Sequence, residues 1–183
     1  MINTAVKIND KPCAFRYPRG NGIGVDLPNI NETLAIGKGK IVRRGKQVVI
    51  LCLGARLEEC KKAAETLSAK GIELTIVDAR FAKPLDEKLI MEMATTHEAL
   101  ITIEEGSIGG FGSHVAQLLS ERGVFDKGLK FRSMTLPDVF IDQDSPEAMY
   151  KKAELDNLSI VNKVEDILKS NIVLAQNKNK NLN

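Results

Sequence analysis

The sequence has few of the residues that mark metal-binding or disulfide-bonded proteins. It contains three cysteines, Cys13, Cys52 and Cys60, and two histidines in 183 residues. Three irregularly spaced cysteines do not make a disulfide framework, and no cysteine pair stands near either histidine. We therefore expect no metal site and interpret all three cysteines as small core hydrophobes.

An excess of charge of one sign and long apolar runs are also missing. The net charge is +2, and Lys and Arg are interleaved with Asp and Glu along the chain. Such a chain has no broad positive field, so we expect neither a nucleic-acid partner nor a membrane. No apolar run approaches the roughly 20 residues that span a bilayer, and the first residues lack the apolar segment of a signal peptide. The expected location is the cytoplasm.

From residue 47 onward, strand and helix patterns alternate. Short apolar runs predict buried strands at 47–53, 72–79, 99–105 and 130–136. Helical patterns lie at 55–71, from Asp86, at 113–123, from Ser145-Pro146 and at 158–170. With a further strand within 34–44, the sequence predicts an α/β fold: a mostly parallel five-stranded sheet with helices on both faces.

The two ends of the chain differ from this core. Residues 20–33 carry Gly, Pro and Asn at the density of a linker and separate residues 1–19 from the domain at 34–170. The pattern of residues 1–19 predicts a short helix, a proline turn and one strand, and these elements cannot bury a core alone. We interpret them as the end of a preceding domain. Residues 171–183 are rich in Asn and Lys and are expected to be disordered.

The glycine-rich loop EEGSIGGFGSH joins a strand to a helix, where doubly wound folds bind phosphates. Glu104 and Glu105 at the strand end would repel an anion, and the glycines fit neither common phosphate motif. Three interpretations stay open: a tight structural or subunit-interface loop, an acidic contact that aids a neighbouring active site, and a ligand site in its own right. Gly109, Gly110 and His114 would belong to any of them.

No residue of the sequence stands out as catalytic. His97 lies at the end of an expected helix, where capping is favoured over catalysis. Asp78, Arg80 and Lys83 follow a strand and are interpreted as an ion-paired strand end. His114 opens the helix after the glycine loop, and neither neighbouring serine has the motif of a hydrolase nucleophile.

Two arginines stand close together in KPCAFRYPRGNG. In an extended strand, residues three apart point to opposite faces, so Arg16 and Arg19 should not form one clamp. Arg19, between Pro18 and Gly20, stands at the open strand end. A guanidinium there suits two-bond contact with a phosphate or a carboxylate, although a surface ion pair fits the spacing equally well.

Several blocks of sequence together resemble the C-terminal portion of the 1-deoxy-D-xylulose-5-phosphate synthases over about residues 1–170. They are AFRYPRGNGIGV, IGKGKIVRRG, VDARFAKPLDEKLI, EEGSIGGFGSHVAQLL, LPDVFIDQDSPEAMY and the closing helix. The resemblance implies a transketolase-type C-terminal domain in a thiamine-diphosphate enzyme that joins decarboxylated pyruvate to glyceraldehyde 3-phosphate, the entry step to isoprenoid and thiamine precursors. It also implies that Arg19, the second arginine of RYPRG, grips the substrate phosphate.

The resemblance further implies a partner. In that family the N-terminal domain holds the diphosphate and Mg²⁺, and the middle, pyrimidine-binding domain holds the aminopyrimidine ring. Residues 1–19 would be a remnant of the end of that middle domain, and the segments that bind the cofactor do not lie in this sequence. We expect thiamine diphosphate and Mg²⁺ in the complete enzyme, with no cofactor bound and no turnover by this chain alone. The expected partners are the N-terminal and pyrimidine-binding domains, in a homodimer. One departure is Glu154, in KKAELD, where the family has glycine.

Two alternatives remain. The chain could be a non-catalytic transketolase C-terminal domain that acts as an interaction or dimerisation module through an apolar, glycine-rich edge. It could also be the tail of a 2-oxo acid dehydrogenase beta subunit, which shares the fold and the cofactor and would pair with an acyltransferase core.

Overall fold

The computed structural model describes residues 1–180 except 19, 21, 23, 26–28 and 30. Within these residues the sheet strands are β1 (Lys40–Arg43), β2 (Val48–Leu53), β3 (Leu74–Asp78), β4 (Ala99–Glu104) and β5 (Lys130–Met134). The helices are α1 (Ile2–Val6), α2 (Leu57–Ser68), α3 (Glu87–Thr96), α4 (Phe111–Glu121), α5 (Pro146–Lys152) and α6 (Asn157–Lys180), with a 3₁₀ turn, η1, at Phe125–Lys127.

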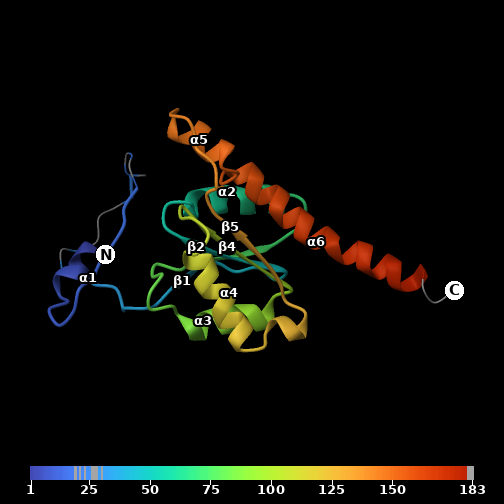
Figure 1. Cartoon of the computed structure of the whole chain (residues 1–183), viewed down its shortest axis with the longest axis horizontal. Coiled ribbons are helices and arrows are strands. Elements are labelled where there is room, and N and C mark those ends of the chain that lie inside the picture. The colour runs from blue at the N-terminus through green and yellow to red at the C-terminus, as the bar shows by residue number, and fades with distance from the viewer. Residues whose placement is uncertain (19, 21, 23, 26–28, 30, 181–183) are drawn as a thin grey trace.

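The strands form one sheet in the order β1-β3-β2-β4-β5. Figure 1 shows this sheet between the helices. β2 pairs with β3 and β4 in parallel, β4 pairs with β5 in parallel, and β1 alone runs antiparallel, against β3. The central position of β2 agrees with its sequence, because a strand covered on both faces is an unbroken apolar run. The expected α/β fold with a mostly parallel five-stranded sheet is therefore confirmed.

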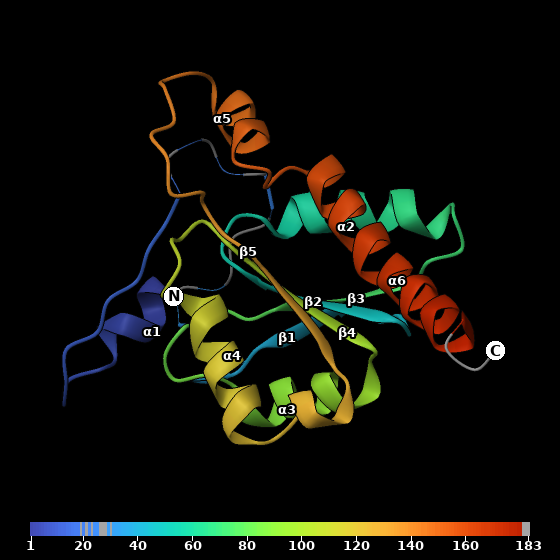
Figure 2. The same ribbon diagram turned by 45° about the vertical axis from the view of Figure 1, so that its right-hand side comes forward.

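Alternating residues of β2 supply the two cores. Val48, Ile50 and Cys52 pack on the face covered by α2 and α6. Val49 and Leu51 pack on the face covered by α3 and α4 (Figure 2). All five are at most 1% exposed. Because successive side chains of a strand point to opposite faces, one six-residue strand anchors both helical layers.

Several helix ends lie where the sequence placed them. The Asp86 carboxylate accepts a hydrogen bond from the Leu89 N–H at 3.3 Å and caps α3. The Ser145 hydroxyl accepts one from the Ala148 N–H at 3.2 Å, with proline at the first turn of α5. His97 ends α3, and its Nδ1 lies 2.9 Å from the Met93 carbonyl oxygen, which confirms the capping interpretation.

The N-terminal segment differs from expectation. Residues 12–18 form no strand, because no strand of the described chain lies beside them to pair with. Cys13 in this segment is exposed, so the core interpretation holds for Cys52 and Cys60 and is wrong for Cys13. The strand expected within 34–44 begins only at Lys40, because the chain turns at Gly37, whose φ is +69°.

The last helix is longer than expected. The backbone of α6 remains helical to Lys180, past the boundary placed at residue 170. The division of the chain into domain, linker and tail stays a prediction. None of the helices in the described part of the chain is both long and apolar enough to cross a bilayer.

Candidate functional site

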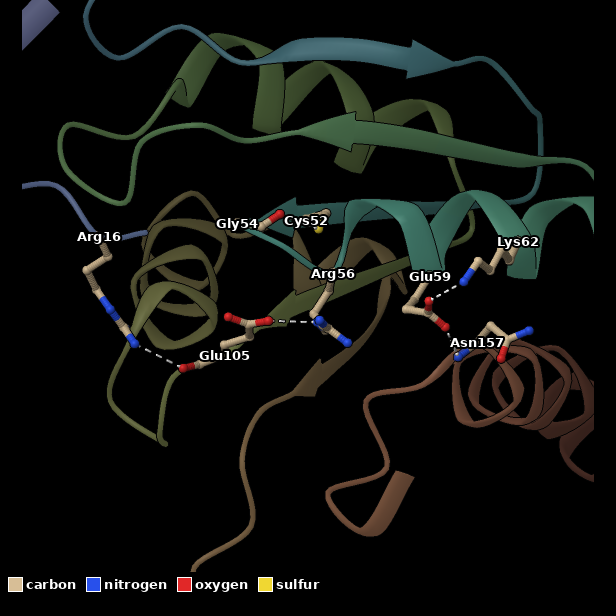
Figure 3. A network of polar contacts seen from close by, with 8 residues as sticks. All are labelled: Arg16, Cys52, Gly54, Arg56, Glu59, Lys62, Glu105 and Asn157. Carbon is tan, nitrogen blue, oxygen red and sulfur yellow. Dashed lines mark hydrogen bonds and ion pairs between the residues drawn. The ribbon is translucent and has the colours of Figure 1, made fainter. Parts of the chain in front are cut away.

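Four segments far apart in the sequence meet at the carboxyl edge of the parallel strands, and Figure 3 shows Arg16, Arg56 and Glu105 there. They are the N-terminal segment with Arg16, the loop after β2 with Arg56, the loop after β4 with Glu105, and α5 with Tyr150. This edge is where open α/β sheets place their ligand-binding loops, because the strand ends of successive parallel strands converge there.

The side chain of Glu105 lies at the centre of this group of segments. Arg56 Nε donates a hydrogen bond to Glu105 Oε1 at 2.8 Å, and the two side chains are only 12% and 21% exposed. The Arg56 guanidinium lies 3.4 Å from the centre of the Tyr150 ring, a cation–π stack. Burial and then a hydrogen bond with Glu105 raise the pKa of Tyr150, so its phenol stays protonated.

The backbone of the same loop binds two other segments. Arg16 Nη2 donates to the Glu105 carbonyl oxygen at 3.3 Å, which brings the N-terminal segment to this edge (Figure 3). The Leu136 N–H donates to the carbonyl oxygen of the next residue, Gly106, at 2.9 Å. Two successive carbonyls therefore tie residues before the domain and the loop after β5 to the glycine-rich loop.

Glu104 occupies the N-terminus of α4. Its side chain is buried, and Oε1 accepts a hydrogen bond from the Gly112 N–H at 2.9 Å. The N-cap residue, Gly110, has no side chain to satisfy the free N–H groups of the first turn, and the carboxylate does so instead. A Cβ on Gly106 or Gly110 would lie 2.5 or 2.6 Å from Glu104 Oε2, so these glycines make room for the carboxylate.

This arrangement bears on the three interpretations of the loop. The position where a phosphate would meet the N–H groups of α4 is taken by the loop's own carboxylate. Among the described residues, no group of three or more His, Cys, Asp or Glu could hold a metal ion. The residues that the structure describes therefore do not fit thiamine diphosphate or Mg²⁺, and we derive no step through either group.

The expected site residues fall into separate places. Arg19 lies outside the described residues. Gly109 has a φ of +97°, and its N–H donates to the Ser113 hydroxyl at 2.9 Å. The side chain of His114 is exposed on the first turn of α4, apart from the group around Glu105. Glu105 alone among these residues joins several segments.

The strand end after β3 is ion-paired, as expected. Arg80 Nε lies 3.4 Å from Asp78 Oδ2. Arg80 also has a φ of +59°, a conformation that a non-glycine residue seldom adopts. In the described part of the chain Lys83 joins no ion pair, so the expectation holds for two of its three members.

Arg56 and Tyr150 were not singled out in the sequence. A signal for Arg56 was present: it follows Gly54 at the end of β2, and β2 pairs in parallel with β4, which ends at Glu104. Carboxyl ends of neighbouring parallel strands lie together, so an arginine there can reach the carboxylate. Tyr150 gave no comparable signal, because α5 is joined to the sheet only by the long loop after β5.

Large apolar side chains are exposed around the same edge. The three segments that meet at Glu105 and Gly106 carry Phe15, Tyr17, Ile108, Val139 and Phe140, which are 40%, 83%, 78%, 65% and 101% exposed. Exposed large apolar side chains on segments that are tied to one another are candidates for a surface that another protein covers. We call these five residues the apolar edge.

A second polar chain ties α2 to α6 beside the site (Figure 3). Glu59 accepts hydrogen bonds from the Asn157 N–H at 3.1 Å and from Lys62 Nζ at 2.7 Å. Asn157 begins α6, so the carboxylate satisfies one of the free N–H groups of that helix. These contacts join α2 to α6, and Arg56 lies at the start of α2.

The sheet order, the two helical layers and the loops at the carboxyl edge define an α/β domain of the transketolase C-terminal kind. Residues 37–160 match the family model for the transketolase C-terminal domain. The chain belongs to this family.

Two solved structures are similar to it. A split-gene transketolase, described as an inactive β4 tetramer, is 32% identical with a TM-score of 0.69, over 79% of this chain and 46% of that chain. Transketolase from Campylobacter jejuni subsp. jejuni NCTC 11168 is 13% identical with a TM-score of 0.52, over 71% of this chain and 18% of that one; this likeness shows the fold alone. The protein thus spans less than half the length of either chain.

Proposed function

We propose that this chain forms the C-terminal part of a 1-deoxy-D-xylulose-5-phosphate synthase and contributes Arg19 to the binding of the phosphate of glyceraldehyde 3-phosphate. The observation that carries the proposal is the hydrogen bond from Arg16 to the Glu105 carbonyl. It draws the segment of RYPRG to the carboxyl edge of the sheet, where α/β domains bind ligands. Arg19 follows in that segment, beside Gly20.

The chemistry of the complete enzyme would be shared between polypeptide segments. Thiamine diphosphate, held with Mg²⁺ by partner domains, supplies the decarboxylation of pyruvate and the carbon that is transferred. This chain would bind and orient the acceptor through the planar guanidinium of Arg19, which matches a phosphate by two hydrogen bonds. Turnover then requires a partner.

The apolar edge is the surface on which we place that partner. Phe15 and Tyr17 flank Arg16 in the sequence and are exposed, so a domain that continues from this segment would cover them. The split-gene transketolase supports a partner polypeptide, because a split gene encodes an enzyme in separate parts.

The test measures formation of 1-deoxy-D-xylulose 5-phosphate from pyruvate and glyceraldehyde 3-phosphate with Mg²⁺ and thiamine diphosphate. The chain is assayed alone and co-expressed with the N-terminal and pyrimidine-binding domains of such a synthase. We expect product only in the co-expressed sample. Product from neither sample would reject the proposal, and product from the chain alone would reject the need for a partner.

Arg19→Ala tests the residue assignment in the co-expressed enzyme. We expect the KM for glyceraldehyde 3-phosphate to rise about a hundredfold and the KM for pyruvate to change little, because a charge-assisted pair to phosphate is lost. Arg44→Ala, at an arginine near the far edge of the sheet, is the control. An equal rise in both KM values would contradict the assignment of Arg19 to the substrate phosphate.

A second function is favoured by the split-gene transketolase, which is described as an inactive β4 tetramer. In this alternative the chain is a non-catalytic module that self-associates through the apolar edge. Sedimentation would then give a stable oligomer that co-expression of cofactor domains neither dissociates nor activates. A neighbouring reading frame that encodes those domains favours the first function.

A further inference from the structure

Glu105 binds different segments with its side chain and with its backbone. The carboxylate is held by Arg56 at 2.8 Å, and the Arg56 guanidinium stacks on the Tyr150 ring of α5. The carbonyl oxygen accepts Arg16 Nη2 at 3.3 Å. One residue therefore connects α2, α5 and the N-terminal segment.

The side chain fixes the direction of the carbonyl. Glu105 is followed by Gly106, and a glycine on that side leaves the peptide after Glu105 freer to rotate than another residue would. A carboxylate that is mostly buried and paired with an equally buried guanidinium cannot change rotamer without exposing an unpaired charge to a poorly solvated site. The pairing with Arg56 thus holds the backbone of Glu105 in one orientation.

The N-terminal segment depends on this anchor. Its first part is tied to the linker side, where Asn3 Nδ2 donates to the carbonyl oxygens of Asn29 and Glu32 and Thr4 Oγ1 accepts from the Leu34 N–H. Residues 10–18 have no helix or strand of their own. Arg16 supplies their hydrogen bond to the α/β domain.

We propose that Glu105 is a positioning residue: its pairing with Arg56, which stacks on Tyr150, aims its carbonyl at Arg16 and thereby holds residues 10–18 against the carboxyl edge of the sheet. The consequence for substrate rests on the proposed function, since Arg19 follows in the same segment and a misplaced guanidinium would meet the phosphate poorly. Glu105 acts through Arg16 and the backbone, and it makes no contact with substrate itself.

The experiment measures how tightly the N-terminal segment is held, and it uses the cysteines already present in the chain. Cys13 lies in the N-terminal segment and is exposed, whereas Cys52 and Cys60 are fully buried, so a thiol-reactive nitroxide labels Cys13 in the full chain. A second label at Ser120→Cys, exposed on α4, allows the distance between the two labels to be measured by pulsed EPR. The wild-type background should give one narrow distance distribution.

Three variants decide the question. Glu105→Gln removes the charge pair and keeps the size of the side chain, and Arg16→Ala removes the exposed donor without touching the core. Both should broaden the distribution about twofold or more. Glu73→Gln is the control, because it removes another glutamate–arginine pair, in which Arg43 Nη2 lies 2.8 Å from Glu73 Oε2, far from Glu105. This variant should leave the distance distribution narrow.

An unchanged distance distribution in both Glu105→Gln and Arg16→Ala overturns the proposal. Broadening in Arg16→Ala alone overturns the role of the Glu105 side chain. Arg16 is exposed, so Arg16→Ala should fold even if Glu105→Gln does not. A narrow distance distribution in Arg16→Ala would show that the hydrogen bond from Arg16 does not hold the N-terminal segment.

Kinetics of the co-expressed enzyme separate this inference from the proposed function. Glu105→Gln should raise the KM for glyceraldehyde 3-phosphate about tenfold with kcat little changed, because a binding group is displaced and no reacting group is lost. If Arg19→Ala leaves that KM unchanged, the proposed function fails while the EPR result still decides the anchor. If Arg19→Ala raises it and Glu105→Gln does not, the positioning role is overturned.

Discussion

The buried carboxylate of Glu104 accepts a hydrogen bond from the backbone N–H of Gly112 at 2.9 Å. The next residue, Glu105, pairs with Arg56 on the opposite face of the sheet. Two adjacent glutamates therefore have different tasks: Glu104 caps α4, and Glu105 joins the N-terminal segment to the domain. Alternation along a strand produces this division, since β4 ends at Glu104 and successive side chains point to opposite faces.

Gly110→Ala tests the space that the Glu104 carboxylate needs. An added Cβ would lie 2.6 Å from Glu104 Oε2, so the buried carboxylate must move away from the start of α4. We expect the free energy of unfolding to fall by about 2 kcal/mol, from overpacking and a disturbed hydrogen bond. Urea denaturation measures the change.

Gly22→Ala is the matched control for that substitution, because a Cβ there meets nothing within 4 Å. It should leave the unfolding free energy within about 0.5 kcal/mol of wild type. Equal stability of Gly110→Ala and wild type would show that Glu104 does not fill the start of α4 as described.

Glu154→Gly is expected to stabilise the protein. Glu154 is exposed and has a φ of +57°, in the left-handed region that follows α5, where glycine carries no Cβ penalty. The gain should be about 0.5–1 kcal/mol, because relief of the strain is partly offset by the greater freedom of glycine in the unfolded chain. The measurement is the midpoint of thermal or urea unfolding.

Glu154→Ala separates strain from charge. It removes the same carboxylate and keeps the Cβ in the left-handed conformation, so it should give no gain. A gain as large as that of Glu154→Gly would assign the effect to charge and contradict the backbone explanation.

Asp86→Asn is expected to weaken the protein most at neutral pH. Burial works to raise the pKa of Asp86, but hydrogen bonds from the N–H groups of Leu89 and Gly39, and from Lys38, outweigh it and hold the pKa below its usual value. A carboxylate with a lowered folded pKa stabilises the protein above its unfolded pKa of about 4, and this contribution is lost as the pH falls through the folded pKa.

The difference in unfolding free energy between wild type and Asp86→Asn should be about 1–2 kcal/mol at pH 7 and should shrink below pH 4. Urea denaturation across pH 2–7 follows it. Lys38→Met, which removes one partner and leaves both backbone donors, should reproduce only part of the loss. A difference that stays constant with pH would contradict the role of the ionised carboxylate.

Tyr150→Phe tests whether the phenol hydroxyl contributes a hydrogen bond to Glu105. At pH 7 we expect a loss of about 1 kcal/mol, the contribution of one hydrogen bond. Burial and Glu105 raise the pKa of Tyr150 in the folded protein, so the unfolded chain ionises first as the pH rises past about 10. Wild type then loses this part of its stability, and its advantage over Tyr150→Phe should shrink there.

Denaturation series at pH 7–11 on both proteins make that comparison. Tyr17→Phe, at an exposed tyrosine of the N-terminal segment, is the control. An advantage of wild type that grows above pH 10 would show that the phenol is not the hydrogen-bond donor to Glu105.

The core of the fold could be predicted from the sequence because its strands are covered on both sides. The run at 47–53 became β2 and the run at 99–105 became β4, each shifted by only a residue at its ends. Residues 12–18 could not be assigned in the same way, because a strand needs a neighbour that a local pattern does not contain. The position of the capping residues Asp86 and Ser145 was local, and it was predictable.

The sequence by itself determined the apolar runs, the helix starts and the glycine-rich loop with its two glutamates, since these depend on spacing between near neighbours. The tertiary structure decided which partner each glutamate meets. Arg56 is 49 positions from Glu105, and Arg16 is 89 positions from it. Contacts over such separations arise only when the parallel strands align their carboxyl ends, and this alignment is a property of the whole sheet.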